Sequence, residues 1–242
     1  MQGRIRVEFA VSAVRLRLVT WNIHRCVGSD GVKSPARCAQ VLQEIGADIV
    51  VLQEVESTPG RADDVLQYLA AETNSPAVAG PTMVSGHTHY GNALMTRIPV
   101  EAVRHHDISV EGREPRAALD VDLRHCGASI QLVATHLGLR PAERRTQVEK
   151  LVPLVRDESR RLVLLAGDLN EWFLWGRPLR RLHRIFPDTP HRRSWPARWP
   201  LFALDRIWVN PRQYLCRLAV HKTPLSRVAS DHLPLVADIC ID

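Results

Sequence analysis

Eight short runs along the chain are rich in β-branched and aliphatic residues, and several are almost continuously apolar. Runs of this kind are typical of strands that are covered on both faces, as in layered α/β proteins. They lie at residues 15–21, 48–53, 93–96, 117–123, 130–135, 162–166, 203–209 and 235–239. The sequence therefore predicts a strand-rich core that extends through almost the whole chain.

Three amphipathic patterns, at 34–45, 61–72 and 142–155, indicate helices between these runs. Strands and helices alternate at first, but strands dominate from about residue 93 to residue 135, which indicates mixed rather than uniformly parallel sheets. We therefore expect an α/β fold of the α+β type, built as a layered sandwich. No long linker or charge block divides the chain, so we expect one domain over 1–242, with 1–13 as a flexible or peripheral segment.

The basic residues are almost all arginine and give a formal net charge of +6. Arginine binds phosphate groups well, although a composition bias of the source genome would produce the same excess. Between residues 172 and 212, aromatic side chains alternate with nine arginines and only two acids. Such a segment suits a nucleic-acid backbone or an anionic membrane surface, and it is equally consistent with aromatic side chains that simply pack the segment onto the core.

The five cysteines are scattered, odd in number and show no CxxC pair: Cys26, Cys38, Cys126, Cys216 and Cys240. We therefore predict reduced cysteines, with neither a disulfide framework nor a zinc ribbon. The apolar stretch near the N-terminus is too short and interrupted for a signal peptide or a membrane span. These features favour a cytoplasmic protein, at most peripheral to a membrane, and none indicates an obligate protein partner.

Polar residues follow or precede the apolar runs in five places. The five clusters are Asn22-Ile23-His24, Gln53-Glu54, His136, Asp168-Leu169-Asn170 and Ser230-Asp231-His232. Each cluster alone is more often an ordinary turn than a binding site. Since ligand sites of α/β sheets lie at strand ends, five clusters together indicate one pocket.

The chemistry that these residues support is narrow. Glu54 and Asn22 offer the hard oxygen ligands that Mg²⁺ accepts, and Mn²⁺ is a substitute, whereas zinc prefers more histidine or cysteine. An ionised aspartate can deprotonate an attacking water, and a metal, a histidinium or an arginine can stabilise the charge that grows on a phosphate. The sequence therefore predicts metal-dependent hydrolysis of a phosphate ester.

Seven motifs resemble those of the endonuclease/exonuclease/phosphatase superfamily, the deoxyribonuclease-I-like phosphoesterases, and they occur in that family's order. They are Thr20-Trp21-Asn22-Ile23, Leu52-Gln53-Glu54-Val55, Tyr90-Gly91-Asn92-Ala93-Leu94, Thr135-His136-Leu137, Gly167-Asp168-Leu169-Asn170, Leu204-Asp205-Arg206-Ile207 and Ser230-Asp231-His232-Leu233-Pro234. The resemblance implies a four-layer sandwich of two packed mixed β-sheets flanked by helices.

The resemblance also implies roles around a metal and a water. Glu54 would be the principal metal ligand, with Asn22 beside it and Asp231 near enough to assist. Asp168 would position and activate the nucleophilic water, and Asn170 would hold that water or a phosphate oxygen.

Further roles concern the phosphate. His232 would bind and neutralise it, with Asp205 orienting the imidazole. His136 would be a second histidine on the phosphate side, and Arg116 would contact the phosphate. Asn92 or Tyr90 would line the same pocket.

The superfamily includes nucleases, inositol-phosphate phosphatases and lipid phosphodiesterases, so the fold does not name the substrate. The chain lacks an arginine after Asn170 and a Trp-Cys pair before Leu204, which disfavours the inositol-polyphosphate branch. A likeness of residues 90–147 to small bacterial members found near lipid metabolism favours a phospholipid or another small phosphodiester. A DNA nuclease, abasic-site or general, is the alternative. A catalytically silent phosphate-binding module is disfavoured because the centre is complete.

Overall fold

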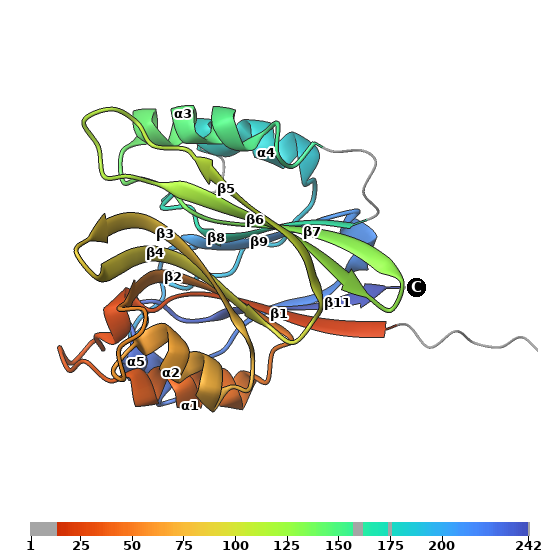
Figure 1. Ribbon diagram of the computed structural model, residues 1–242. Coiled ribbons are helices and arrows are strands. Elements are labelled where there is room, and N and C mark those ends of the chain that lie inside the picture. Colours follow the sequence, from red (N-terminus) through yellow and green to blue (C-terminus); the bar gives the residue numbers. More distant parts are fainter. Residues whose placement is uncertain (1–13, 157–161, 174–175, 242) are drawn as a thin grey trace, which may run out of the picture.

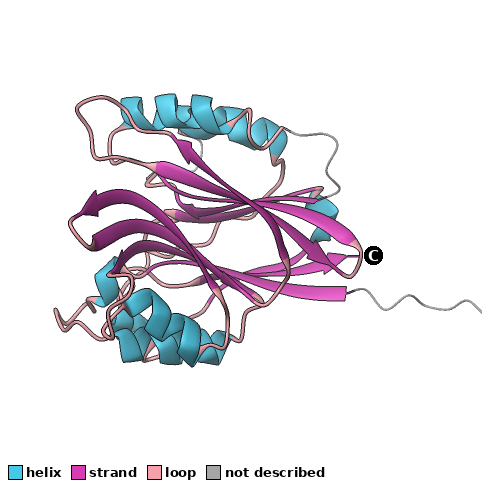
Figure 2. Cartoon of the chain, viewed as in Figure 1, coloured by secondary structure: helices cyan, strands magenta, loops and turns pink. Residues whose placement is uncertain are grey.

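The computed structural model describes residues 14–156, 162–173 and 176–241. Two β-sheets pack face to face, and helices cover the outer face of each (Figures 1 and 2). The described part of the chain is therefore a four-layer α/β sandwich, as expected. The predicted N-terminal segment 1–13 lies outside the described residues.

The first sheet has six strands in the order β10-β11-β1-β2-β4-β3, in which only β1 and β2 are parallel. The strands are β10 (Leu215–Val220), β11 (Leu235–Ile241), β1 (Val14–Asn22), β2 (Ile49–Ser57), β4 (Thr88–Thr96) and β3 (Ala77–Ser85). Its outer face carries α1 (Pro35–Ile45), α2 (Val65–Glu72) and α5 (Ser226–Ala229) (Figure 1).

The second sheet has five strands in the order β5-β6-β7-β8-β9, in which only β7 and β8 are parallel. The strands are β5 (Val100–Asp107), β6 (Ala117–His125), β7 (Ala128–His136), β8 (Leu162–Asp168) and β9 (Asp205–Asn210). The helices α3 (Pro141–Leu151) and α4 (Arg180–Ile185) cover its outer face (Figure 1). Three short 3₁₀ helices complete the described fold: η1 (His24–Cys26), η2 (Arg177–Leu179) and η3 (Arg212–Tyr214).

Successive residues of the central strands are buried on opposite sides of their sheet. In β8, Leu164 belongs to the apolar core between the sheets, whereas Leu165 belongs to the core beneath α3 and α4. In β1, Leu18 likewise faces the other sheet, and Trp21 packs in the core with α1. Strands that are covered on both faces have no polar side, which explains the continuous apolar runs of the sequence.

The same alternation carries four of the predicted site residues to one place. Asn22, His136, Asp168 and Asp205 each continue the row of side chains that points between the two sheets. The register pairs His136 with Asp168 and Asp168 with Asp205. These four polar side chains therefore lie where the core between the sheets opens at the strand ends.

All eight predicted strands are present, but the sequence did not reveal three others. The unpredicted strands β3, β5 and β10 lie at the edges of the sheets, and many of their residues are half-buried or exposed. Edge strands need no continuous apolar run, so they lack the signal on which the prediction depended. The helix expected at 61–72 begins only at Val65, because Asp64 caps its N-terminus by accepting from the Leu66 amide.

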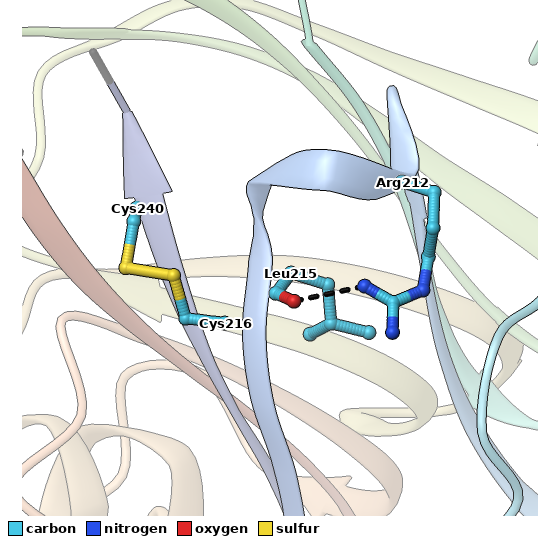
Figure 3. Close-up of a disulfide and its surroundings, with 4 residues drawn as sticks. All are labelled: Arg212, Leu215, Cys216 and Cys240. Carbon is cyan, nitrogen blue, oxygen red and sulfur yellow. Dashed lines mark hydrogen bonds between the residues drawn. A yellow bond between two sulfur atoms is a disulfide. The ribbon is translucent and has the colours of Figure 1, made fainter.

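The expectation that all five cysteines are reduced is wrong for one pair. Cys216 of β10 and Cys240 of β11 form a disulfide between neighbouring antiparallel strands, with their Cα atoms 6.0 Å apart (Figure 3). Beside it, Arg212 donates a hydrogen bond of 2.8 Å to the Leu215 carbonyl oxygen. The partners are 24 residues apart, so only the strand pairing brings them together.

The part of the expected cytoplasmic location that rested on reduced cysteines loses this support. No described helix is long and apolar enough to cross a membrane.

Candidate active site

A pocket of about 410 Å³ opens at the ends of the strands, and nine of the eleven predicted site residues line it. The nine are Asn22, Glu54, Tyr90, Arg116, His136, Asp168, Asn170, Asp231 and His232. Asp205 is fully buried behind His232. Asn92 does not line this pocket: its amide donates to the Ala117 carbonyl oxygen at 3.0 Å, and it borders a smaller neighbouring cavity.

Glu54 points into the pocket because the pairing of its strand, β2, is irregular at this position. The pairing of β2 with β4 shifts register between Leu52 and Val55, and Glu54 has a left-handed backbone with φ of 56°. A non-glycine residue in this region is strained, and such strain is concentrated at functional sites. Without the shift, strand alternation would direct Glu54 toward the helices, because Gln53 already points inward and bonds Thr20.

Asn22 connects two carboxylates across the pocket. Its Nδ2 donates to Glu54 Oε1 at 2.9 Å and to Asp168 Oδ2 at 3.1 Å, while its Oδ1 accepts from the His24 amide at 3.0 Å. Two acids from different sheets thus converge on one amide, and a divalent cation would neutralise such a pair.

Asp168 is the most central side chain of the site. It is almost fully buried, and its Oδ1 accepts from the Asn170 amide at 2.9 Å. Its Oδ2 lies 3.5 Å from His136 Nε2 and 3.6 Å from His232 Nε2. Gly167 permits the close approach of β8 to β7, because a Cβ there would collide with the Thr135 carbonyl oxygen.

His232 is held by a buried carboxylate. Its Nδ1 lies 2.9 Å from Asp205 Oδ2, an oxygen that also accepts from the Ser194 hydroxyl. Burial alone would lower the pKa of His232, but the charges of Asp205 and Asp168 outweigh burial and raise this pKa to about 10. His232 is therefore an imidazolium at neutral pH, with Nε2–H directed toward the pocket.

His136 is held in the opposite protonation state. Arg116 Nη1 lies 3.1 Å from its Nδ1, and Asn170 Nδ2 lies 3.0 Å from its Nε2. Burial, reinforced by the charge of Arg116, lowers the pKa of His136 to about 3. Because a guanidinium can only donate, Nδ1 must accept, which leaves the single proton of the neutral ring on Nε2, 3.5 Å from Asp168 Oδ2. Asn170 Nδ2 then only contacts Nε2, and it donates its hydrogen bond to the Leu137 carbonyl oxygen at 2.8 Å.

Several residues of the site carried no recognisable signal in the sequence. Ser194 supports Asp205, and Trp195 donates from Nε1 to Asp231 Oδ2 at 3.3 Å. Trp172 and Arg25 also line the pocket, the latter with its guanidinium 5.1 Å from the centre of the Tyr90 ring. The sequence drew attention to the aromatic residues of the segment 172–212. The contact of Trp195 with Asp231 could not be predicted, because only the tertiary fold brings these two residues together.

Two sets of side chains could hold a metal ion. Among the described residues, one group of histidine, cysteine or acidic ligands lies within 4.8 Å of one another: Asp168, Asp205 and His232. That group is already bonded internally, and Asp205 is fully buried. The other set is the predicted one, Glu54, Asn22 and Asp231, all of which line the pocket. Glu54 and Asp231 offer accessible carboxylates for a hard cation, whereas Asn22 is buried and its Oδ1 accepts from the His24 amide.

A sandwich of two mixed sheets with an acid and histidine centre at its strand ends defines a class of phosphoesterase folds. The model of the endonuclease/exonuclease/phosphatase family matches residues 19–232, and the chain belongs to this family. Members of the family are generally hydrolases that act on phosphate esters or nucleic acids, and they typically depend on a divalent metal.

Individual relatives agree with this assignment. The chain is 34% identical to the uncharacterised protein YbhP of Escherichia coli K12 over 220 residues, which is 82% of this chain and 85% of that protein. Among solved structures, an endonuclease/exonuclease/phosphatase from Beutenbergia cavernae has a TM-score of 0.73 and 24% identity, covering 94% of this chain and 72% of that one. The human Nocturnin catalytic domain, solved with a bound sulfate, has a TM-score of 0.67 and 20% identity, covering 93% of each chain.

Proposed function

We propose that the protein is a divalent-metal-dependent phosphodiesterase that works as a single domain and cleaves its substrate by attack of an activated water. The observation that carries the proposal is the position of Asp168 Oδ2, which lies between an imidazolium and a neutral imidazole and shares the Asn22 amide with Glu54. A base, a cation and a hydrogen-bond donor at one point are what hydrolysis of a phosphate ester needs.

Asp168 is the proposed general base. Its Oδ1 is fixed by the Asn170 amide, so Oδ2 is the oxygen that faces the pocket and can accept a proton from water. Asn170 lines the pocket beside it and is placed to hold the water or a phosphate oxygen.

The positive side of the site would bind the phosphate. The His232 imidazolium, the Arg116 guanidinium and the ring of neutral His136 all line the pocket. Negative charge grows on the phosphate oxygens during attack, and preorganised donors stabilise it without rearrangement. Asp205 would act through His232 by fixing the orientation and charge of its ring.

Glu54, Asn22 and Asp231 would hold the metal, with Mg²⁺ or Mn²⁺ as the ions that oxygen ligands prefer. Asn22 could serve as a ligand only through Oδ1, which now accepts from the His24 amide, so Glu54 is the principal candidate. When bound, the ion would supply Lewis-acid stabilisation of a phosphate oxygen.

The side chains of the segment 172–212 bear on the substrate class that we propose. The expectation of a phospholipid rested on a likeness of residues 90–147 to other bacterial proteins, whereas the aromatic and arginine side chains of 172–212 suited a membrane surface and a nucleic acid equally. Trp172, Trp195 and Phe202 pack against one another beside the pocket, and exposed arginines of the same segment flank Trp195 and Trp199. Other arginines, those of η2 and α4, lie on the outer helical layer, where no large exposed apolar residue of the described chain accompanies them, and on this ground we favour a nucleic acid over a phospholipid as the substrate.

Hydrolysis of bis-p-nitrophenyl phosphate with Mg²⁺, with Mn²⁺ and with a chelator tests the proposal. We expect turnover with either ion, none with the chelator, and little p-nitrophenyl phosphate cleavage by comparison. Metal-independent turnover, or no turnover of any diester in a panel that includes DNA, RNA and phospholipids, would count against it.

A further inference from the structure

A second, strongly basic groove lies on the outer helical layer, away from the strand-end pocket. It measures about 430 Å³ and runs between α3 on one side and η2 with α4 on the other. Its charged lining consists of five arginines and one acid: Arg145, Arg177, Arg180, Arg181, Arg184 and Glu149. The remaining lining residues, Val148 and Pro178, are buried.

Most of this charge is not neutralised by the protein. Arg181 lies 3.4 Å from Glu149, whereas the other four arginines are exposed and have no ion pair or side-chain hydrogen bond with any described residue. Arg180 and Arg184 stand four residues apart on α4, a spacing at which like charges repel on a helix. A fold that keeps such a repulsive cluster in a concave surface is suited to a ligand with several negative charges.

Both walls of the groove begin close to the rim of the pocket. Leu139 lines the pocket, and α3 begins two residues later at Pro141. Trp172 also lines the pocket, and Arg177 follows five residues later, so their Cα atoms are at most about 18 Å apart. A flexible polyanion bound in the pocket can therefore extend into the groove.

The shape and lining of the groove favour a nucleic-acid backbone over a membrane. Membrane-surface sites combine basic residues with protruding apolar side chains. The large exposed apolar residues of the described chain lie elsewhere, for example Leu139, Trp172 and Phe173 near the pocket, and none lines the groove. Arginine forks in a concave channel match a chain of separate phosphates.

We infer that the groove between α3 and α4 binds the phosphate backbone of a nucleic-acid substrate outside the catalytic pocket. The inference rests on the proposed phosphodiesterase function and narrows its substrate class to nucleic acids of several nucleotides. Small diesters cannot reach both sites, so they would gain nothing from the groove.

Binding of a labelled single-stranded oligonucleotide, about 12 nucleotides long, tests the inference by fluorescence anisotropy in EDTA over a salt series. We compare the full chain with Arg180→Gln/Arg184→Gln and with the matched control Arg15→Gln/Arg217→Gln, which removes two exposed arginines on the six-stranded sheet. The groove variant should bind roughly ten- to a hundredfold more weakly at low salt. Its slope of log K against log salt should fall by about 1.4, since each lost contact with a single strand contributes about 0.7. The control should change affinity less than about twofold.

Two parallel assays separate this inference from the proposed function. Hydrolysis of bis-p-nitrophenyl phosphate should be the same in the groove variant and in the unaltered protein, whereas the KM for the oligonucleotide should rise about tenfold with little change in kcat. Equal oligonucleotide binding by both variants would contradict nucleic-acid binding in the groove and would leave the proposed phosphodiesterase activity unaffected. Loss of binding to vesicles of phosphatidylcholine with phosphatidylserine, with oligonucleotide binding unchanged, shows a membrane surface instead and also overturns it.

Discussion

The two sheets line the pocket in different ways. The wall from the five-stranded sheet is almost fully buried and already hydrogen-bonded, with Asp168, Asn170 and His136 interlocked. The wall from the six-stranded sheet is open at its two acids, since Glu54 is only half-buried and the Asp231 side chain keeps 39% of its exposure, whereas Asn22 and His232 on the same wall are buried. One wall is fixed before any ligand arrives, and the other keeps oxygen ligands accessible.

This difference indicates that the two walls have different chemical roles. Buried, hydrogen-bonded groups suit the steps in which charge develops, because they need no rearrangement at that moment. Accessible carboxylates suit an ion that must enter and keep part of its water shell. Only a few bonds connect the walls, among them Asn22 with Asp168 and His232 with Asp205.

The largest expected effect comes from the buried wall at Asp168. The substitution Asp168→Asn keeps the size of the side chain but removes the proposed base, so kcat should fall about 10³- to 10⁴-fold. The matched control is Asp188→Asn, at an exposed position whose left-handed backbone asparagine tolerates. If Asp168→Asn retained activity within tenfold of the control, Asp168 would not be the base.

A smaller effect, with a distinct pH signature, is expected at Asp205. The carboxylate holds the pKa of His232 near 10, so the protein should lose activity at alkaline pH as this imidazolium loses its proton. In Asp205→Asn the largest of the three carboxylate charges that raise this pKa is gone, so the alkaline limb of the pH–rate profile should move to lower pH. Activity at neutral pH should fall about ten- to a hundredfold. The variant His232→Gln, which lacks the imidazole, sets the lower limit of activity for this comparison. An alkaline limb that does not move would assign Asp205 a structural role only.

The smallest effect is expected for Trp195, which bonds Asp231 of the open wall from the segment between β8 and β9. Trp195→Phe removes the Nε1–H that bonds Asp231 but keeps an aromatic ring, so we expect a two- to fivefold rise in the metal concentration needed for half-maximal activity, on the order of one weak hydrogen bond. Trp199→Phe, at a residue that is 71% exposed, is the control. An unchanged metal requirement would show that Asp231 does not bind the metal.

The sequence predicted the buried wall better than the open one. Strand alternation places Asp168 and His136 between the sheets, and for both the signal was an apolar run followed by a polar residue, whereas Asp205 lies inside its run and was named only through the family motif. Glu54 reaches the pocket only through a register shift and a left-handed backbone, and no periodic pattern encodes either. The polar pair Gln53-Glu54 after an apolar run marked Glu54 as a candidate, and the family motif implied its role, but neither predicted the backbone that turns it into the pocket.

Other features depend on contacts between distant segments. Ser194 and Trp195 support Asp205 and Asp231 from an irregular segment, and the disulfide joins two strands that pair only in the folded chain. Asn92 lies two residues after Tyr90 on the same face of β4, but its amide is bonded to the Ala117 carbonyl oxygen and it borders the smaller neighbouring cavity instead of the pocket.

The most direct test of the two-wall account is a calorimetric titration with Mn²⁺ of the unaltered protein, Glu54→Gln and Asp205→Asn. The account predicts that Glu54→Gln loses at least tenfold in affinity for the ion, whereas Asp205→Asn binds it almost normally. The reverse result would place the metal in the buried cluster of Asp168, Asp205 and His232 and contradict the account.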